Sequence, residues 1–115
     1  MNVIEVAVYA LVLAGGTDPF TCEKRPQGVA CTNGLGAVLN DHGNIEYSNG
    51  VQVAKLKDGG IAFTNGVTTH RGSAGWIQFS SGVSVRRMSD GSFRFNNGMS
   101  CKAVEPTKVD CRKAD

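Results

Sequence analysis

The most regular feature of this chain is a sixteen-residue pattern of apolar, polar and glycine positions that occurs five times in succession. The units are TNGLGAVLNDHGNIEY, SNGVQVAKLKDGGIAF, TNGVTTHRGSAGWIQF, SSGVSVRRMSDGSFRF and NNGMSCKAVEPTKVDC, beginning at Thr32, Ser48, Thr64, Ser80 and Asn96. Glycine fills the third position of all five units and the twelfth position of four, while the fourth, fourteenth and sixteenth positions are apolar. A fixed period is the signature of a repeat architecture.

Each unit predicts two short β-strands with a turn at either end. Apolar and polar residues alternate in stretches such as 51–53 and 61–63, which is the period of a half-buried strand. The pairs Asn49-Gly50 and Asp58-Gly59 supply the backbone conformations that tight hairpin turns need. Glycine recurs too often for a helix in this region. The expected fold is therefore all-β, an antiparallel meander of tandem repeats, with a β-solenoid as the alternative.

The length of the turns decides which positions share a face of the sheet. Two-residue turns would place the fourth and sixth positions on the face opposite to the fourteenth and sixteenth. Three-residue turns would place all four apolar columns on one face. The repeat pattern leaves both arrangements open.

Four cysteines fall into two close pairs, Cys22 with Cys31 and Cys101 with Cys111. Their spacing does not fit zinc sites, whose ligand pairs are usually two to four residues apart. Each pair flanks a proline almost evenly, so its two cysteines would face each other across a hairpin, within disulfide reach. We therefore predict one disulfide in each terminal hairpin, with residues 20–31 as a degenerate sixth unit. Terminal repeats are expected to cap the stack.

The N-terminal segment MNVIEVAVYALVLAGG stands outside the repeat. Its β-branched content suits a buried strand, and its apolar run is too short to span a bilayer as a helix. Small residues follow the run as in a signal peptide, although Glu5 stands where a leader carries positive charge. We expect an ordered apolar strand, with a signal-like leader as the alternative. The chain then divides into residues 1–19, a single β-repeat domain over residues 20–111, and a short polar tail over residues 112–115.

The chain carries no recognisable catalytic motif. Nucleophile-elbow, phosphate-loop and zinc-protease patterns are absent from the sequence. The two histidines, His42 and His70, have no spaced partner that suggests a metal site, so surface roles are expected for both. Asp41, Asp58 and Asp90 recur near one turn, but a calcium loop needs several acids close together. We expect a protein that is not an enzyme and that uses no cofactor or metal.

A column of basic residues offers a binding hypothesis, although the net charge is only +2. The eighth position of successive units is Lys55, Arg71 and Arg87, and Arg86 precedes the last of these. If the units stack, the column forms a ladder of like charges that an anionic ligand would stabilise. The alternative is a solvated edge guarded by cations against aggregation. Trp76, in an otherwise small or polar column, is expected either at a contact surface or over flanking glycines.

Two functions follow from these features. The first is a structural or assembly protein, a rigid component of an extracellular or virion assembly. Its N-terminal strand would pair with other copies or with neighbouring structural proteins. The second is a secreted binding module for an anionic ligand such as an acidic polysaccharide, a phosphate-bearing surface or an acidic protein. The paired cysteines favour an extracellular, cell-surface or virion location, and no transmembrane segment is expected.

Overall fold

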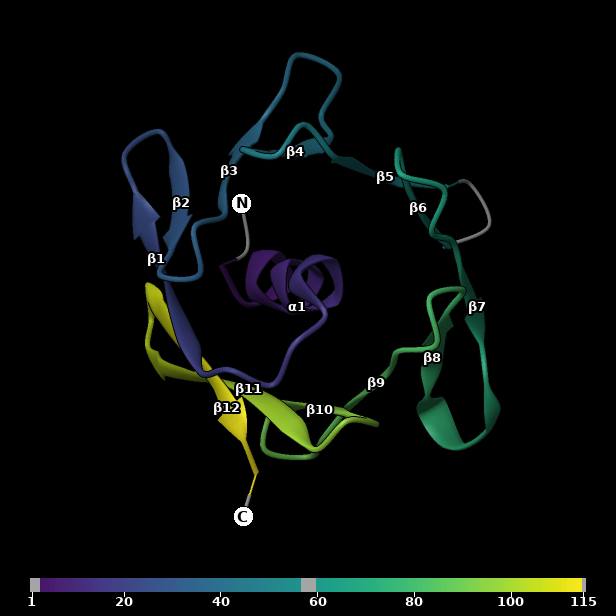
Figure 1. The fold of residues 1–115 in the computed structure, drawn as a ribbon. Coiled ribbons are helices and arrows are strands. Elements are labelled where there is room, and N and C mark those ends of the chain that lie inside the picture. Colours follow the sequence, from purple (N-terminus) through teal and green to yellow (C-terminus); the bar gives the residue numbers. More distant parts are fainter. Residues whose placement is uncertain (1–2, 57–59, 115) are drawn as a thin grey trace.

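A computed structural model describes residues 3–56 and 60–114 of the chain, and over these residues it contains one antiparallel sheet wrapped around one α-helix (Figure 1). The helix α1 spans Val3–Ala14. The strands are β1 Phe20–Arg25, β2 Gly28–Cys31, β3 Gly36–Leu39, β4 Ile45–Tyr47, β5 Gln52–Lys55, β6 Ile61–Phe63, β7 Thr69–Arg71, β8 Ile77–Phe79, β9 Ser84–Arg87, β10 Phe93–Phe95, β11 Met99–Glu105 and β12 Lys108–Lys113. A short 3-10 turn covers Ser73–Gly75.

The sheet is a meander whose two chain ends meet. Its strand order is β6-β5-β4-β3-β2-β1-β12-β11-β10-β9-β8-β7, and every neighbouring pair is antiparallel. The outermost strands β6 and β7 are joined by one isolated bridge, between Ala62 and Thr68. The sheet is therefore a nearly closed cylinder, and Figure 1 looks along its axis. The meander prediction is confirmed, and the solenoid alternative is wrong.

Three-residue loops precede the first strand of each repeat unit and explain the repeated glycines, whereas the terminal hairpins β1–β2 and β11–β12 have two-residue turns. At one such loop the Tyr47 N–H donates to the Val51 carbonyl, and the Gly50 N–H donates to the Tyr47 carbonyl. Gly50 has a φ of 90°, and the third-position glycines of the other four units also have positive φ. A hairpin loop of three residues places its last residue in this left-handed region, which glycine enters without steric cost.

The two polar residues before each of these glycines have separate roles. The side chain at the first position accepts a hydrogen bond from a backbone N–H of the preceding unit, as in Gly36 N–H to Ser48 Oγ at 3.0 Å. The asparagine at the second position accepts from the N–H two residues later, as in Val51 N–H to Asn49 Oδ1 at 3.1 Å. These bonds satisfy backbone donors at the loops, so the repeated sequence encodes both the turn and its attachment to the neighbouring unit.

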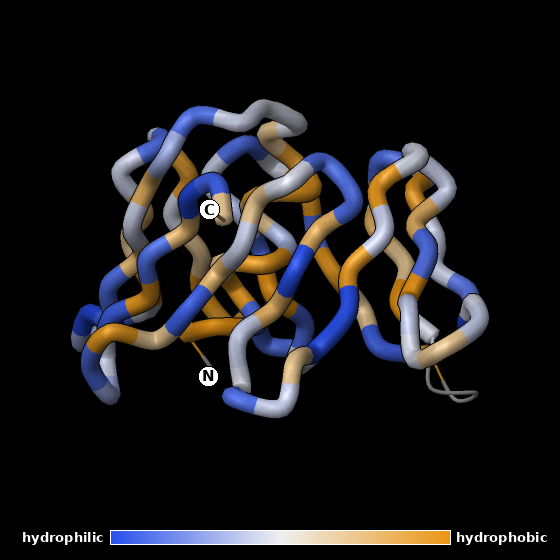
Figure 2. Tube along the Cα trace, turned by 90° about the horizontal axis from the view of Figure 1, so that it is seen from below, coloured by the Kyte–Doolittle hydropathy of each residue, from blue (hydrophilic) through white to orange (hydrophobic). Residues whose placement is uncertain are grey.

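Because the loops have three residues, the apolar columns share the inner face of the cylinder. Val53 pairs with Phe63, and Val85 pairs with Phe95; all four side chains are buried. The fourth-position residues of the first four units pack against the same core as partly buried side chains, and that of the fifth unit, Met99, is fully buried. The three-residue alternative is thus the correct one. Figure 2 shows the chain coloured by hydropathy, with apolar and polar segments alternating along the strands.

Residues Val3–Ala14 form a helix inside the cylinder, so the prediction of an apolar strand in the N-terminal segment was wrong. Val6, Ala7 and Ala10 are fully buried, and Leu11 is 1% exposed. The Tyr47 hydroxyl donates a 2.6 Å hydrogen bond to the Val6 carbonyl. A lone strand in this interior would leave its N–H and C=O groups without partners, whereas a helix satisfies most of its own. This requirement outweighs the β-branched composition of the segment. The signal-like leader stays a prediction.

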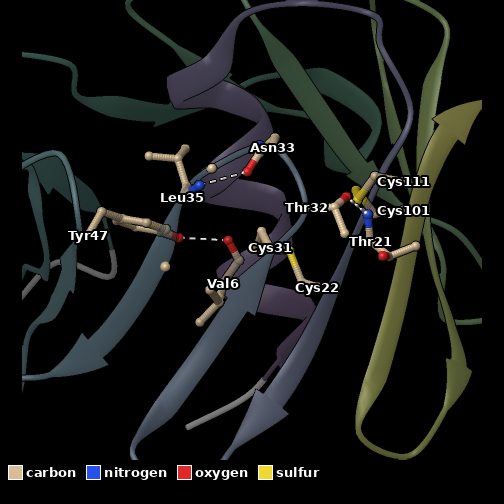
Figure 3. Close-up of a disulfide and its surroundings, with 12 residues drawn as sticks. Val6, Thr21, Cys22, Cys31, Thr32, Asn33, Leu35, Tyr47, Cys101 and Cys111 are labelled. Atoms are coloured by element: carbon tan, nitrogen blue, oxygen red, sulfur yellow. Dashed lines mark hydrogen bonds between the residues drawn. A yellow bond between two sulfur atoms is a disulfide. The ribbon is translucent and has the colours of Figure 1, made fainter.

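Both predicted disulfides are present, Cys22–Cys31 across β1 and β2 and Cys101–Cys111 across β11 and β12 (Figure 3). The terminal hairpins do not cap opposite ends of a stack, because β1 and β12 pair with each other. Phe20 lies opposite Cys111 in this pairing. We call β1, β2, β11 and β12 the clasped wall. α1 lies closest to these four strands, so the helix is off-centre in the cylinder.

Candidate functional site

Three of the basic residues predicted from the sequence lie at one end of the cylinder. Lys55, Arg71 and Arg87 end strands β5, β7 and β9, which all run in the same direction because neighbouring strands are antiparallel. All three side chains are exposed. We call this end, defined by Lys55, Arg71 and Arg87, the basic rim. The five third-position glycine loops lie at the opposite end, which we call the polar rim.

The three cations are not the ladder of adjacent charges that the sequence suggested. One strand separates β5 from β7 and another separates β7 from β9, so neighbouring cations are two strands apart, about 10 Å in a sheet. An apolar residue stands directly opposite each cation. Lys55 faces Ile61, Arg71 faces Ile77, and Arg87 faces Phe93. The expected like-charge repulsion between adjacent strands was therefore wrong, and each cation instead flanks an apolar position.

Among the described residues, acidic side chains neutralise the basic rim only in part. Lys55 Nζ lies 3.3 Å from Glu5 Oε1 of the helix. The other ion pairs between described residues are Arg25–Glu23 and Arg112–Asp110, so neither Arg71 nor Arg87 has an acidic partner in residues 3–56 and 60–114. An edge-guard role would also require an open edge, yet β5 and β9 are paired on both sides. Among the three cations, only Arg71 lies on an outer strand of the sheet.

An apolar cavity of about 240 Å³ lies inside the cylinder beneath the basic rim. It separates α1 from the wall opposite the clasped wall, and its lining includes Ile4, Val8, Ile61, Ile77, Val85 and Phe93. Three of these residues are the cross-strand partners of the rim cations. Lys55 and Glu5 also border the cavity, and Ile77 is 37% exposed, so the space opens at the rim. It exists because the helix packs toward the clasped wall.

Tyr9 places a phenol beside the acidic group of this cavity. Its hydroxyl donates to Glu5 Oε1 at 3.3 Å, and its ring meets Phe63 edge-on at a centroid distance of 5.7 Å. Burial, reinforced by the charge of Glu5, raises the pKa of Tyr9 well above its ordinary value. Burial likewise raises the pKa of Tyr47. Both phenols therefore remain neutral hydrogen-bond donors, and Glu5 is held between Tyr9 and Lys55.

Arg86 and Trp76 do not join the basic rim cations on the inner face. Arg86 lies opposite Arg94, and both are exposed on the outer face of β9 and β10.

Trp76 follows the loop after β7 and is half-buried, and its carbonyl accepts from the Gly72 N–H at 2.7 Å. The side chain of Gln78, not Trp76, fills the space beside Gly72. A contact role for Trp76 stays a prediction.

The outer face also holds a basic group that the sequence reasoning missed. Arg94, Lys102 and Arg112 border a shallow polar hollow of about 270 Å³ together with Asp90 and Asp110. Arg112 Nε lies 2.6 Å from Asp110 Oδ2. Hydrogen bonds from Ser92 lower the pKa of Asp90. The strand register could have revealed this group, because Arg94 and Arg112 both lie opposite Ser100. In this hollow, unlike at Arg71 and Arg87, acidic side chains lie beside the basic ones.

The described residues contain no cluster of three or more His, Cys, Asp or Glu side chains that could hold a metal ion. His42 lies in an exposed loop, and His70 Nε2 lies 2.8 Å from Gln78 Oε1 on the outer face. Asp90 serves its own turn, since its Oδ1 accepts from the Ser92 N–H at 2.9 Å. Asp58 and Gly59 lie outside the described residues.

Two disulfides are compatible with an oxidising location. Within residues 3–56 and 60–114, no helix has the length and apolar character needed to cross a membrane. Comparisons with protein-family models, with curated proteins and with solved structures found no match to this chain.

Proposed function

We propose that this protein is a secreted, non-catalytic binding module that holds an anionic ligand at the basic rim. The observation that carries the proposal is the placement of Arg71 and Arg87 at one end of the cylinder, without acidic partners among the described residues. Guanidinium groups form strong charge-assisted hydrogen bonds with carboxylate, phosphate and sulfate oxygens. The two disulfides support an extracellular setting.

The cylinder suits this role because it fixes the spacing of the charges. Each rim cation extends from a hydrogen-bonded strand whose register is set on at least one side by an antiparallel neighbour. Their backbone positions are therefore determined before a ligand arrives, which lowers the entropic cost of binding. The outer group around Arg94 is less suited to an anion because Asp90 and Asp110 share its hollow.

The test is a titration of the full chain with inorganic phosphate and with a sulfated oligosaccharide, followed by amide chemical shifts. We expect shifts at Lys55, Arg71 and Arg87 that diminish as salt rises. The double variant Arg71→Gln/Arg87→Gln should bind at least about fivefold more weakly, since each lost charged hydrogen bond is worth about 1.5–3 kcal/mol when well formed and less when exposed.

The matched control is Arg86→Gln/Arg94→Gln, which removes the same charge from the outer face. It should change the affinity by less than about twofold. If the shifts instead centre on Arg94, Lys102 and Arg112, or if the two double variants lose affinity equally, the basic rim is not the binding site.

A structural or assembly role is the second candidate, but it lacks the strand on which it depended. The N-terminal segment is buried in its own chain, so copies would have to meet through the outer surface. Val38 is 45% exposed on β3, which is the kind of apolar surface such a contact would use. The mass of the particle in solution tests this role: a stable multimer that Val38→Glu dissociates would support it.

A further inference from the structure

The cavity beneath the basic rim is the feature that the anionic ligand alone does not explain. It is about 240 Å³ in volume, and its wall is formed largely by aliphatic and aromatic side chains. A well-packed interior contains few voids larger than a water molecule. Apolar voids of this kind are typically dry and accept apolar guests. The cavity therefore offers a favourable place for an apolar group that enters from the rim.

We infer that the ligand is a small amphipathic anion whose charged head binds Arg71 and Arg87 and whose apolar tail enters the cavity. This inference rests on the proposed function and specifies the ligand class. The sheet register supports it directly, since Arg71 lies opposite Ile77, and Arg87 lies opposite Phe93. A head held by either guanidinium is thus one strand away from a residue that lines the cavity. The repeat produces this pairing of charge and apolar surface.

The size of the cavity limits the tail to a single short chain or one ring. Pockets that enclose drug-sized ligands usually measure about 300–1,000 Å³, and this space is smaller. A lipid with two acyl chains would not fit. A cationic head is also disfavoured. Glu5 at the border of the cavity already pairs with Lys55, and Arg71 and Arg87 add positive charge at this end.

The loose junction of the sheet lies close to this space. Ile61 of β6 and Ile77 of β8 both line the cavity, and β7 lies between them. β7 meets β6 through the Ala62–Thr68 bridge and through Thr69 Oγ1, which accepts from the Ile61 N–H at 2.9 Å. This junction has fewer paired positions than the four that join β1 to β12, so we expect it to open at lower cost than the clasped wall. The tail can therefore enter without disturbing the clasped wall.

The inference is tested on the full chain with octanoate, acetate, octanol and octyltrimethylammonium, by calorimetry and by amide shifts. We expect octanoate to bind at least about a hundredfold more tightly than acetate, because each buried methylene contributes about fourfold. Octanoate should also bind about tenfold more tightly than octanol, and octyltrimethylammonium should bind least. The amide shifts should include Ile61, Ile77 and Phe93. This series needs no altered protein.

Two variants separate the head from the tail. Arg71→Gln/Arg87→Gln should reduce octanoate binding to the level of octanol and leave octanol binding unchanged, whereas Arg86→Gln/Arg94→Gln should change neither. Ile77→Trp, at a partly exposed position, should fill the cavity and weaken octanoate and octanol alike by at least about tenfold. It should leave the binding of phosphate at the rim intact.

The outcomes distinguish this inference from the proposed function. If phosphate binds at the basic rim but octanoate binds no better than acetate, the cavity inference is wrong and the anionic function stands. If octanol binds as tightly as octanoate, the cavity accepts an apolar guest but the rim cations do not hold the charged head, so the inference is wrong and phosphate binding alone decides the proposed function. If no probe binds, both are overturned.

Discussion

The clasped wall and the opposite wall of this cylinder contain the same kind of short antiparallel strands, yet they are held in different ways. β1 and β12 pair through four residue positions, from Phe20–Cys111 to Glu23–Lys108. β6 and β7 meet through one bridge, between Ala62 and Thr68, supplemented by hydrogen bonds between the Thr69 hydroxyl and the Ile61 backbone. The clasped wall carries both disulfides and lies against the helix. The opposite wall has no disulfide, meets the helix through the edge-on contact of Tyr9 with Phe63, and borders the cavity.

This difference shows that the regular repeat units and the irregular ends of the sheet make separate contributions to the fold. The regular units curve the sheet and present one apolar face inward, but their strands are short, with three residues each in β6, β7 and β8. The irregular ends form longer strands, seven residues in β11 and six in β12, and lock them with disulfides. Stability is thus expected to concentrate at the clasped wall, while the opposite wall is free to open for a ligand.

Truncating the helix gives the largest expected contrast between the two walls. Leu11→Ala removes a side chain that is 1% exposed inside the cylinder. It should lower the free energy of unfolding by about 2–5 kcal/mol, through lost burial and a new void. Ile61→Ala, a half-buried site beside the existing cavity, should cost less than half as much. Denaturant titration measures both, and equal losses would show that the helix does not support one wall preferentially.

Removing the two disulfides tests how much they stabilise the clasped wall. Each disulfide closes a loop of nine or ten residues, which stabilises the fold by about 2–3 kcal/mol in the chain-entropy account. Cys22→Ala/Cys31→Ala and Cys101→Ala/Cys111→Ala should each lower the unfolding free energy by this amount. Non-reducing peptide mapping of the unaltered chain should show the same two pairings. A loss below about 1 kcal/mol would indicate that the β1–β12 pairing holds the wall without them.

Alanine substitution of one glycine in each wall compares the two walls through smaller losses of stability. At Gly28 in β2, a Cβ would clash with the Ala37 carbonyl oxygen, so alanine must displace backbone and should cost about 1–3 kcal/mol. At Gly66, in the loop between β6 and β7, the surrounding space is open and only the φ of 96° opposes a side chain. Gly66→Ala should cost about 1 kcal/mol. Thermal unfolding of both variants would test this order, and a neutral Gly66→Ala would contradict the strained turn.

Much of the repeat could be predicted because its physical determinants are local. The Asn-Gly pairs identify the loops, alternation identifies the inward residues, and the positions of the cysteines around a turn identify their partners. The proposed binding site was only half predictable. The eighth column identified Lys55, Arg71 and Arg87, but the residues beneath them and the ion pair with Glu5 depend on which strands become neighbours.

The sequence by itself determined a β-strand region of sixteen-residue units, with glycine turns of fixed conformation and a disulfide in each terminal hairpin. These features depend on residues close together in the chain. Only the tertiary structure decided that β1 pairs with β12, that the segment before them is a helix, and that this helix leaves a cavity on one side. The apolar N-terminal segment suits a strand or a helix almost equally. Enclosure by a sheet that offers it no free edge favours the helix, because a helix can satisfy most of its own backbone hydrogen bonds.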